Sequence, residues 1–219
     1  MKKQKKQRPV VKFRHQTPIR AILFDLDGVL VNSYEAWFRL FNDTLNHFGY
    51  RIITRKEFQR EWGKSTKEDV KYFMPGQTIQ AVRRYYSQRF PRYIRFVKVT
   101  PDAKKVLSKL KKEGYLLGCV TNSHRDITRQ MIQKTGIKKY FKVIVCADEV
   151  KKPKPAPDML FKAMRRLKVK PDEVIFIGDT PTDLMAGIRA KCLTFGYKIN
   201  AKYQIKSLKE LLDQYNFFT

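Results

Sequence analysis

The stretch "AILFDLDGVL", residues 21–30, decides how the rest of the chain can fold. Its apolar residues predict a buried β-strand over residues 19–30, and two carboxylates, Asp25 and Asp27, interrupt that strand. Side chains two positions apart on an extended chain point the same way, so both acids face one site. Gly28 follows at once and allows the backbone to turn sharply. One carboxylate at such a site can attack a substrate while the other moves protons.

Length and composition predict one globular domain with room for a smaller inserted one. The chain has 219 residues, of which 42% are hydrophobic. No apolar stretch approaches the roughly 18 residues that span a bilayer, so we expect no membrane segment. The basic N-terminus lacks the apolar run of about 7–15 residues that a secretory signal needs. Without any CxxC spacing, Cys119, Cys146 and Cys192 are expected to be buried, reduced thiols of a cytoplasmic protein.

The net charge of +27 is unusual for a chain of this size. Lys and Arg number 47 against 20 Asp and Glu, and residues 1–18, which we expect to form a flexible tail, contain no acid. Such a field attracts anions, which include nucleic acid, an acidic surface or a phosphorylated substrate. We favour the plainer interpretation, in which the charges lie on a solvated tail and solvated helix faces.

Helical and strand patterns follow one another in an order that predicts the fold class. Capping patterns at Ser33, at Thr54 to Glu57 and at Ser65 to Glu68 predict that residues 33–96 contain helices only. Beyond residue 97, apolar strands alternate with helices, which predicts a doubly wound parallel α/β sheet. The strands are expected at residues 115–122, 142–148, 173–179 and 192–197, and the helices at 100–114, 127–134, 158–167, 182–190 and 207–215.

The helical stretch lies inside this alternation and is therefore expected to be an inserted cap domain. The sequence divides accordingly into a tail over residues 1–18, a core over 19–32 and 97–219, and a helical cap over 33–96.

Polar residues gather where the predicted strands end. Ligands of open parallel sheets bind beyond the carboxyl ends of the strands, so these residues should converge. Several acids around one point repel each other unless a cation lies among them. Oxygen ligands without clustered His or Cys favour Mg²⁺ over zinc. The converging residues are Asp25, Asp27, Thr121, Asn122, Ser123, Lys152, Lys154, Asp179 and Asp183.

Four of these segments together resemble the motifs of the haloacid dehalogenase superfamily of phosphohydrolases. "DLDGV" at residues 25–29 resembles the first motif, "VTNS" at 120–123 the second, "KPAPD" at 154–158 the third and "GDTPTD" at 178–183 the fourth. The predicted insertion is similar to the small helical cap of the phosphoglycolate phosphatase-like subgroup. The resemblance implies a Rossmann-like core and a hydrolase that acts on phosphorylated substrates.

The resemblance also implies roles for individual acids. Asp25 would be the nucleophile that forms an aspartyl-phosphate, and Asp27 the general acid and base. Mg²⁺ would be held by Asp25, the backbone carbonyl of Asp27 and Asp179. Asp183 would belong to the same metal site, where it orients a water molecule or the lysine.

The remaining motif residues would bind the phosphoryl group. Thr121 and the backbone N–H of Asn122 would hold its oxygens, and a lysine would offset its charge. Both Lys152 and Lys154 precede a Pro-x-Pro pattern, and we favour Lys154 because it begins "KPAPD".

The cap and the segment after the second motif supply candidate substrate contacts. Gly63, Lys64 and Ser65 lie between two predicted cap helices, and Arg125 follows "VTNS". An ordinary helix–helix turn at residues 63–65 and a solvent-exposed Arg125 are the alternatives. Trp37 occupies the place where related sugar-phosphate mutases carry a histidine, which counts against a mutase.

The sequence therefore predicts a Mg²⁺-dependent phosphomonoester hydrolase that acts on a small phosphorylated metabolite. A sugar-phosphate mutase or a pyrophosphatase of the same superfamily stays open as an alternative. A nucleic-acid-associated protein that binds through the basic tail is an alternative of another class. The sequence gives no indication of the oligomeric state.

Overall fold

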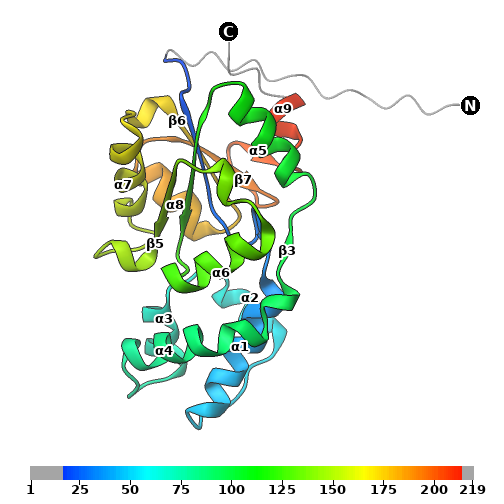
Figure 1. Ribbon diagram of the computed structural model, residues 1–219. Coiled ribbons are helices and arrows are strands. Elements are labelled where there is room, and N and C mark those ends of the chain that lie inside the picture. Colours follow the sequence, from blue (N-terminus) through cyan, green and yellow to red (C-terminus); the bar gives the residue numbers. More distant parts are fainter. Residues whose placement is uncertain (1–16, 214–219) are drawn as a thin grey trace, which may run out of the picture.

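The computed structural model describes residues 17–213 and consists of a sheet flanked by helices together with a separate group of helices (Figure 1). The strands are β1 (Ala21–Phe24), β2 (Val31–Asn32), β3 (Lys98–Val99), β4 (Leu116–Thr121), β5 (Val143–Cys146), β6 (Val174–Gly178), β7 (Leu193–Tyr197) and β8 (Gln204–Ile205). The α-helices are α1 (Tyr34–His47), α2 (Arg55–Glu61), α3 (Thr66–Phe73), α4 (Ile79–Arg89), α5 (Ala103–Lys112), α6 (Arg125–Thr135), α7 (Asp158–Leu167), α8 (Pro181–Arg189) and α9 (Glu210–Asp213). Short 3₁₀ turns cover Phe90–Arg92, Ile94–Phe96, Lys138–Tyr140, Ala147–Glu149 and Pro171–Glu173.

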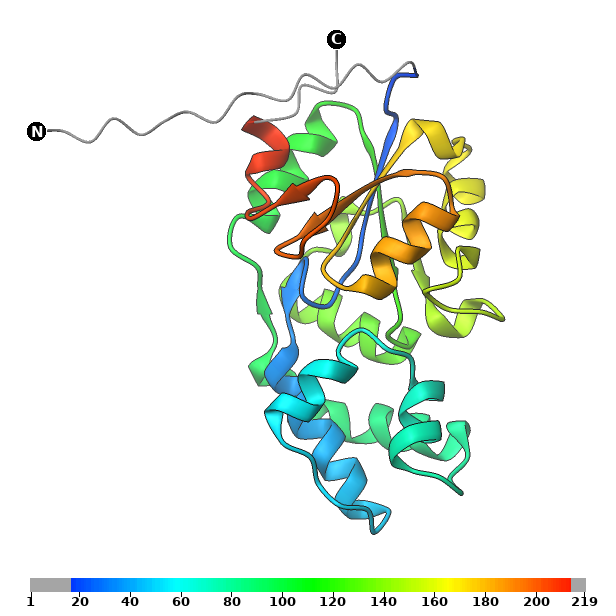
Figure 2. The same ribbon diagram turned by 180° about the vertical axis from the view of Figure 1, so that it is seen from behind.

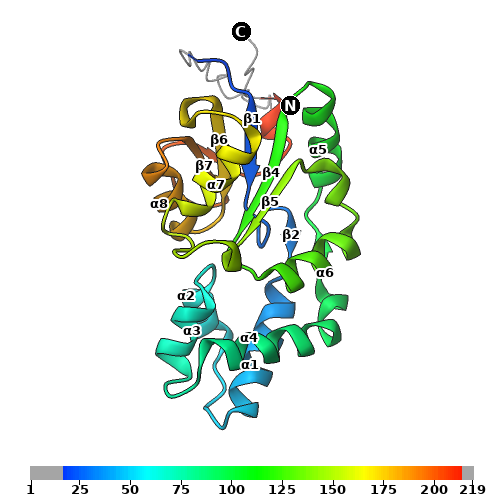
Figure 3. The same ribbon diagram turned by 60° about the vertical axis from the view of Figure 1, so that its left-hand side comes forward.

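The large sheet is parallel and has the strand order β5-β4-β1-β6-β7-β8. This order confirms the predicted α/β fold, and Figure 3 shows β4 and β6 on either side of β1. Successive residues of β1 face opposite sides of the sheet. Leu23 packs in the cluster that contains residues of α7 and α8, whereas Ile22 and Phe24 pack with residues of α5 and α6. Helices α7 and α8 lie on one side of the sheet and α5 and α6 on the other (Figures 1 and 2). Because both faces are buried, β1 is a continuous apolar run in the sequence.

The first strand is shorter than the sequence predicts. It ends at Phe24, and the chain then turns at Gly28, where φ is +86° and the N–H donates to the carbonyl of Val31 at 2.8 Å. The next residues form β2, which pairs antiparallel with β3. The prediction of one strand over residues 19–30 was therefore wrong beyond Phe24. The two-stranded ribbon of β2 and β3, which the sequence did not predict, lies where the chain enters and leaves the group of helices α1–α4.

Helices α1–α4 lie together at the carboxyl edge of the large sheet (Figure 1). We call residues 33–96 the cap and the other described residues the core. Both predicted capping boxes, Thr54 with Glu57 and Ser65 with Glu68, are present. Pro91 follows the end of α4 and lies in a 3₁₀ turn, as its missing N–H requires.

Three further predictions differ from the structure or lie partly beyond it. The helix expected over residues 100–114 begins later, as α5 at Ala103, because Asp102 adopts φ +63°. Strand β8 was not predicted. The C-terminal helix expected over residues 207–215 is observed as α9, and its last residues lie outside the described chain, as does most of the predicted tail at 1–18. None of the helices in residues 17–213 is long and apolar enough to cross a membrane.

The burial of β1 generates a stability prediction. Leu23 is fully buried in the middle of the sheet, so Leu23→Ala should lower the free energy of unfolding by roughly 2–5 kcal/mol. Ile188 on α8 is 70% exposed, and Ile188→Ala should change that free energy by less than about 0.5 kcal/mol. Urea unfolding followed by circular dichroism measures both. Equal effects of the two substitutions would contradict the burial of β1 in the hydrophobic interior.

Candidate active site

Polar residues at the ends of three central strands lie close together. Asp25 follows β1 directly, and its N–H still donates to the carbonyl of Ile177 in β6 at 2.8 Å. Thr121 is the last residue of β4, and Asp179 follows the last residue of β6. Because β4, β1 and β6 are neighbours in this parallel sheet, the side chains that end them converge at its carboxyl edge. The convergence predicted from the sequence is present.

A buried lysine links two of the acids. The Nζ of Lys154 lies 2.5 Å from Oδ1 of Asp25 and 2.6 Å from Oδ1 of Asp183, and it also donates to the carbonyl of Val120 at 3.0 Å. Its side chain is only 2% exposed. Burial alone would lower the pKa of Lys154, but Asp183 and Asp25 raise it above its ordinary value. The ammonium group therefore stays charged, whereas Lys152 is exposed to solvent.

Asp25, Asp179 and Asp183 form a cluster whose ligand atoms lie within 4.8 Å of one another. Both oxygens of Asp183 are occupied, one by Lys154 and the other by the N–H and hydroxyl of Thr180 at the start of α8. The Oδ1 of Asp179, by contrast, is buried without a hydrogen-bond partner among the described residues. The cluster thus offers a divalent cation at least one free carboxylate oxygen.

The electrostatics of the cluster also fit a cation. Burial raises the pKa of Asp179 to about 7, and the charge of Asp183 adds to the rise. Burial likewise raises the pKa of Asp25 well above its ordinary value, although the Lys154 ammonium opposes this. One lysine does not compensate three carboxylates, so a cation with oxygen-ligand preference would stabilise their ionised forms.

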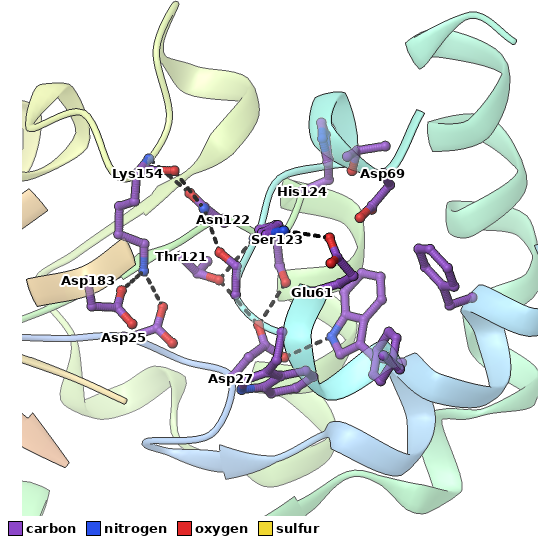
Figure 4. A pocket seen from close by; sticks show the side chains of 17 residues that line it. Asp25, Asp27, Glu61, Asp69, Thr121, Asn122, Ser123, His124, Lys154 and Asp183 are labelled. Atoms are coloured by element: carbon purple, nitrogen blue, oxygen red, sulfur yellow. Dashed lines mark hydrogen bonds and ion pairs between the residues drawn. The ribbon is translucent and has the colours of Figure 1, made fainter. Parts of the chain in front are cut away.

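Asp27 is held by four donors rather than by a cation. Its Oδ1 accepts from the Ser33 hydroxyl at 2.5 Å and from the Trp37 indole N–H at 2.9 Å. Its Oδ2 accepts from the hydroxyls of Ser123 at 2.7 Å and Thr121 at 3.3 Å. These bonds fix the direction of the carboxylate, which lies beside Asp25 at the floor of the cavity (Figure 4).

Sequence reasoning missed most of these donors. Ser33 stands at the start of α1 as predicted, but its hydroxyl donates to Asp27 and accepts no hydrogen bond from the N–H groups of the helix. The ring of Trp37 packs against Tyr86 and Phe90 within the cap. Its N–H nevertheless points to Asp27. The available signal was position, because Trp37 lies one helical turn after Ser33 and shares its face of α1.

The side chain of Asn122 has a role that the sequence did not indicate. It donates to the carbonyls of Gly63 and Lys154 and accepts from the Lys154 N–H, each at 3.0 Å. One amide therefore ties the cap loop and the lysine loop to the end of β4.

The loop between α2 and α3 closes onto the core. The indole N–H of Trp62 donates to Oδ2 of Asp179 at 3.1 Å. Gly63 has φ +84°, and a Cβ at this position would lie 2.6 Å from Cγ2 of Thr180, so a side chain here would separate cap from core. Lys64 lines the cavity, where its ammonium contacts Glu61 at 2.7 Å.

Two predicted contact residues do not reach this cavity. Ser65 is buried at the start of α3, where its N–H and hydroxyl donate to Glu68. The guanidinium of Arg125 pairs with Asp148 and Glu149, and its side chain is 64% exposed. His124 lines the cavity instead. Burial lowers the pKa of His124 to about 4, so its ring is neutral at pH 7.

The comparisons with known proteins agree with this geometry. Residues 22–197 match the sequence model of a family described as haloacid dehalogenase-like hydrolase. The pyrophosphatase PpaX of Bacillus velezensis is 32% identical over 178 residues, which cover 81% of this chain and 82% of that protein. A haloacid dehalogenase-like hydrolase from Bacteroides fragilis has a similar structure, with a TM-score of 0.80, 26% identity and coverage of 88% of this chain and 99% of that one.

A structure of CbbY from Rhodobacter sphaeroides in complex with phosphate is also similar. It has a TM-score of 0.79 and 24% identity, and the match covers 88% of this chain and 96% of that one. Residues 22–197, which match the family model, contain the strand ends, the buried lysine and the acid cluster described above. The chain therefore belongs to the haloacid dehalogenase-like hydrolase family.

Proposed function

We propose that this protein is a metal-dependent phosphatase that uses Asp25 as its nucleophile. The observation that carries the proposal is the contact of the buried Asp25 carboxylate with the Lys154 ammonium at the carboxyl edge of the sheet. The lysine offsets negative charge where a phosphoryl group would meet the nucleophile. The relationship to a pyrophosphatase and the fold shared with a phosphate-bound protein support the choice of phosphoryl chemistry.

The two acids of β1 and its following turn divide the reaction between them. A carboxylate oxygen of Asp25 attacks phosphorus, the bond from phosphorus to the leaving oxygen breaks, and Asp27 gives that oxygen a proton. Asp27 then takes a proton from water, which attacks the aspartyl-phosphate and releases inorganic phosphate and free Asp25. The donors on Asp27 hold it in place for both proton transfers.

Other residues would bind the phosphoryl oxygens. The Thr121 hydroxyl and the backbone N–H of Asn122 lie at the end of β4, beside Asp25. Lys154 would keep its charge throughout, because its pKa is raised. Gly63 and Lys64 of the cap line the cavity, whereas Ser65 of the cap and Arg125 of the core do not.

Mg²⁺ is the cofactor that fits the donor set. Asp25, Asp179 and the backbone carbonyl of Asp27 would hold it, and the buried Oδ1 of Asp179 is free to do so. Asp183 would act through Lys154, because both of its oxygens are already bonded. When bound, the ion would neutralise charge on the phosphoryl group and the nucleophile.

A pyrophosphatase is the second candidate, because the 32% identical relative carries that activity in its name. The same residues would act on either substrate. A mutase is disfavoured, because Trp37 supplies a donor to Asp27 and no group that accepts a proton.

The nucleophile can be tested with p-nitrophenyl phosphate. Asp25→Asn should lower kcat by at least about 10³-fold, because an amide oxygen cannot form the covalent intermediate. Circular dichroism should show an intact fold. Asp43→Asn, which removes one acid of the cap away from the cavity, is the control and should keep its activity. Turnover by Asp25→Asn at the rate of the unsubstituted protein would refute the assigned role.

The two lysines of the third motif give a matched pair. Lys154→Ala leaves Asp25 and Asp183 buried without their cation, so it should cost roughly 3–5 kcal/mol of stability and most of the activity. Lys152→Ala removes an exposed charge and should change neither. Urea unfolding and p-nitrophenyl phosphate turnover measure the two effects. A loss of activity in Lys152→Ala alone would reverse the assignment.

Thermal unfolding without a divalent cation tests the metal site. The folded protein holds a proton on Asp179 up to about pH 7, whereas the unfolded chain releases it near the ordinary value of 3.8. Stability of the metal-free protein should therefore fall as pH rises through this window. Above about pH 7, Mg²⁺ should raise the melting temperature by roughly 3 °C or more. A gain of about 1 kcal/mol in the free energy of unfolding corresponds to 2–4 °C for a protein of this size.

Asp179→Asn should weaken both the pH dependence and the response to Mg²⁺. A melting temperature that Mg²⁺ raises equally in Asp179→Asn and in the unsubstituted protein would place the ion elsewhere.

A further inference from the structure

The cap side chains that line the active-site cavity indicate which kind of leaving group can bind there. This inference rests on the proposed phosphatase function, because the core acids and Lys154 would take the phosphoryl group. The leaving group would then face the cap. Four aromatic residues of the cap, Trp37, Phe41, Phe58 and Trp62, line that side of the cavity. An apolar ring or chain face can pack on them.

The charged side chains of the cap wall are two acids and one lysine. Of the described residues, only Glu61, Lys64 and Asp69 bring charge from the cap to this cavity. The Lys64 ammonium lies 2.7 Å from Oε2 of Glu61, so these two charges offset each other. Asp69 accepts a hydrogen bond from the Tyr86 hydroxyl at 3.2 Å and forms no ion pair with a described residue. Above about pH 7, where Asp69 is ionised, the cap wall therefore has an excess of negative charge.

Both acids are placed to meet a ligand. Figure 4 shows Glu61 and Asp69 extending into the cavity from the cap, opposite Asp25 and Lys154. Burial raises the pKa of Asp69 to about 7, so in its ionised form this carboxylate lacks the hydration that it would have at the surface. A hydroxyl group of a substrate could donate to the oxygen of Asp69 that does not accept from Tyr86.

The charge of the leaving group decides whether it fits this wall. A carboxylate or a second phosphate would face Asp69, and Lys64, the one cation that the described cap residues bring to this cavity, is already paired. An ammonium group would be repelled by Lys64 and would lose part of its hydration between the aromatic side chains of the wall. An uncharged group with several hydroxyls avoids both costs, because its hydroxyls donate to the acids and its C–H face packs on the indoles.

We propose that the substrate is the phosphomonoester of an uncharged polyol, such as a sugar or sugar alcohol, and that Asp69 selects against anionic leaving groups. Asp69 is in this respect a specificity-determining residue of the cap. The proposal separates this protein from an enzyme for pyrophosphate, whose leaving group is an anion.

Matched substrates test the selection by charge. Glucitol 6-phosphate and 6-phosphogluconate differ by a hydroxymethyl against a carboxylate, as do glycerol 3-phosphate and 3-phosphoglycerate at shorter length. Glucose 6-phosphate and glucosamine 6-phosphate compare an uncharged with a cationic leaving group. The full chain with Mg²⁺ should show kcat/KM at least about tenfold higher for the uncharged member of the preferred pair, a difference of about 1.4 kcal/mol.

The ratio of kcat/KM between the two members of a pair tests the role of Asp69. Asp69→Asn should lower the preference for the uncharged over the anionic member by about tenfold, and a general loss of activity cancels in this ratio. Asp43→Asn, which removes the other aspartate of the cap, should leave the ratio unchanged. An unchanged ratio in Asp69→Asn would overturn the role of that residue.

The remaining outcomes distinguish this inference from the proposed function. A preference for the carboxylate members, for glucosamine 6-phosphate or for pyrophosphate would overturn the substrate class and leave the phosphatase function intact. Hydrolysis of p-nitrophenyl phosphate with none of the pairs hydrolysed would do the same. No hydrolysis of any of these compounds would overturn the proposed function, and this inference with it.

Discussion

The ion pairs of Lys154 with Asp25 and Asp183 are the interaction on which the rest of the site depends. Buried charges are costly unless they are compensated, and all three side chains are almost completely enclosed. The lysine lies far from both acids in the chain, so their contact requires β1, β4 and β6 to be adjacent and the loop before α7 to fold back. The parallel sheet provides this arrangement. Compensation remains incomplete because Asp179 adds a third acid, which is the physical reason that the site suits a cation.

Much of this site could be predicted from the sequence because, in a parallel sheet, the order of the strands along the chain indicates where their ends lie. Once the alternation of strands and helices indicated a parallel sheet, Asp25, Thr121 and Asp179 had to converge at one edge. The ribbon of β2 and β3 could not be predicted, since two residues per strand show no periodicity. The bonds from Trp37 and Trp62 to the core acids were also out of reach. They depend on how the cap packs against the core, and the local sequence pattern of an amphipathic helix does not predict that packing.

Charge acts on two scales in this protein. The net charge of +27 attracts anions from a distance and is indifferent to their identity. At the cap wall, where water is largely excluded, individual groups such as Asp69 and the Glu61–Lys64 pair matter more than the total. A strongly basic surface and an acidic inner wall are therefore compatible. Under the proposed function, the surface would attract phosphorylated molecules and the cap wall would distinguish among them.

The contact of the cap with the core has a practical consequence. With the cap in the observed position, the cavity has a volume of about 70 Å³, which is small for an organic phosphate, so movement of the cap would enlarge the space for one. The chain contains two tryptophans, and both donate from the cap to acids of the core. Movement of the cap away from the core would break both of these hydrogen bonds. The intrinsic fluorescence of the two indoles would then report on the contact between cap and core without any added label.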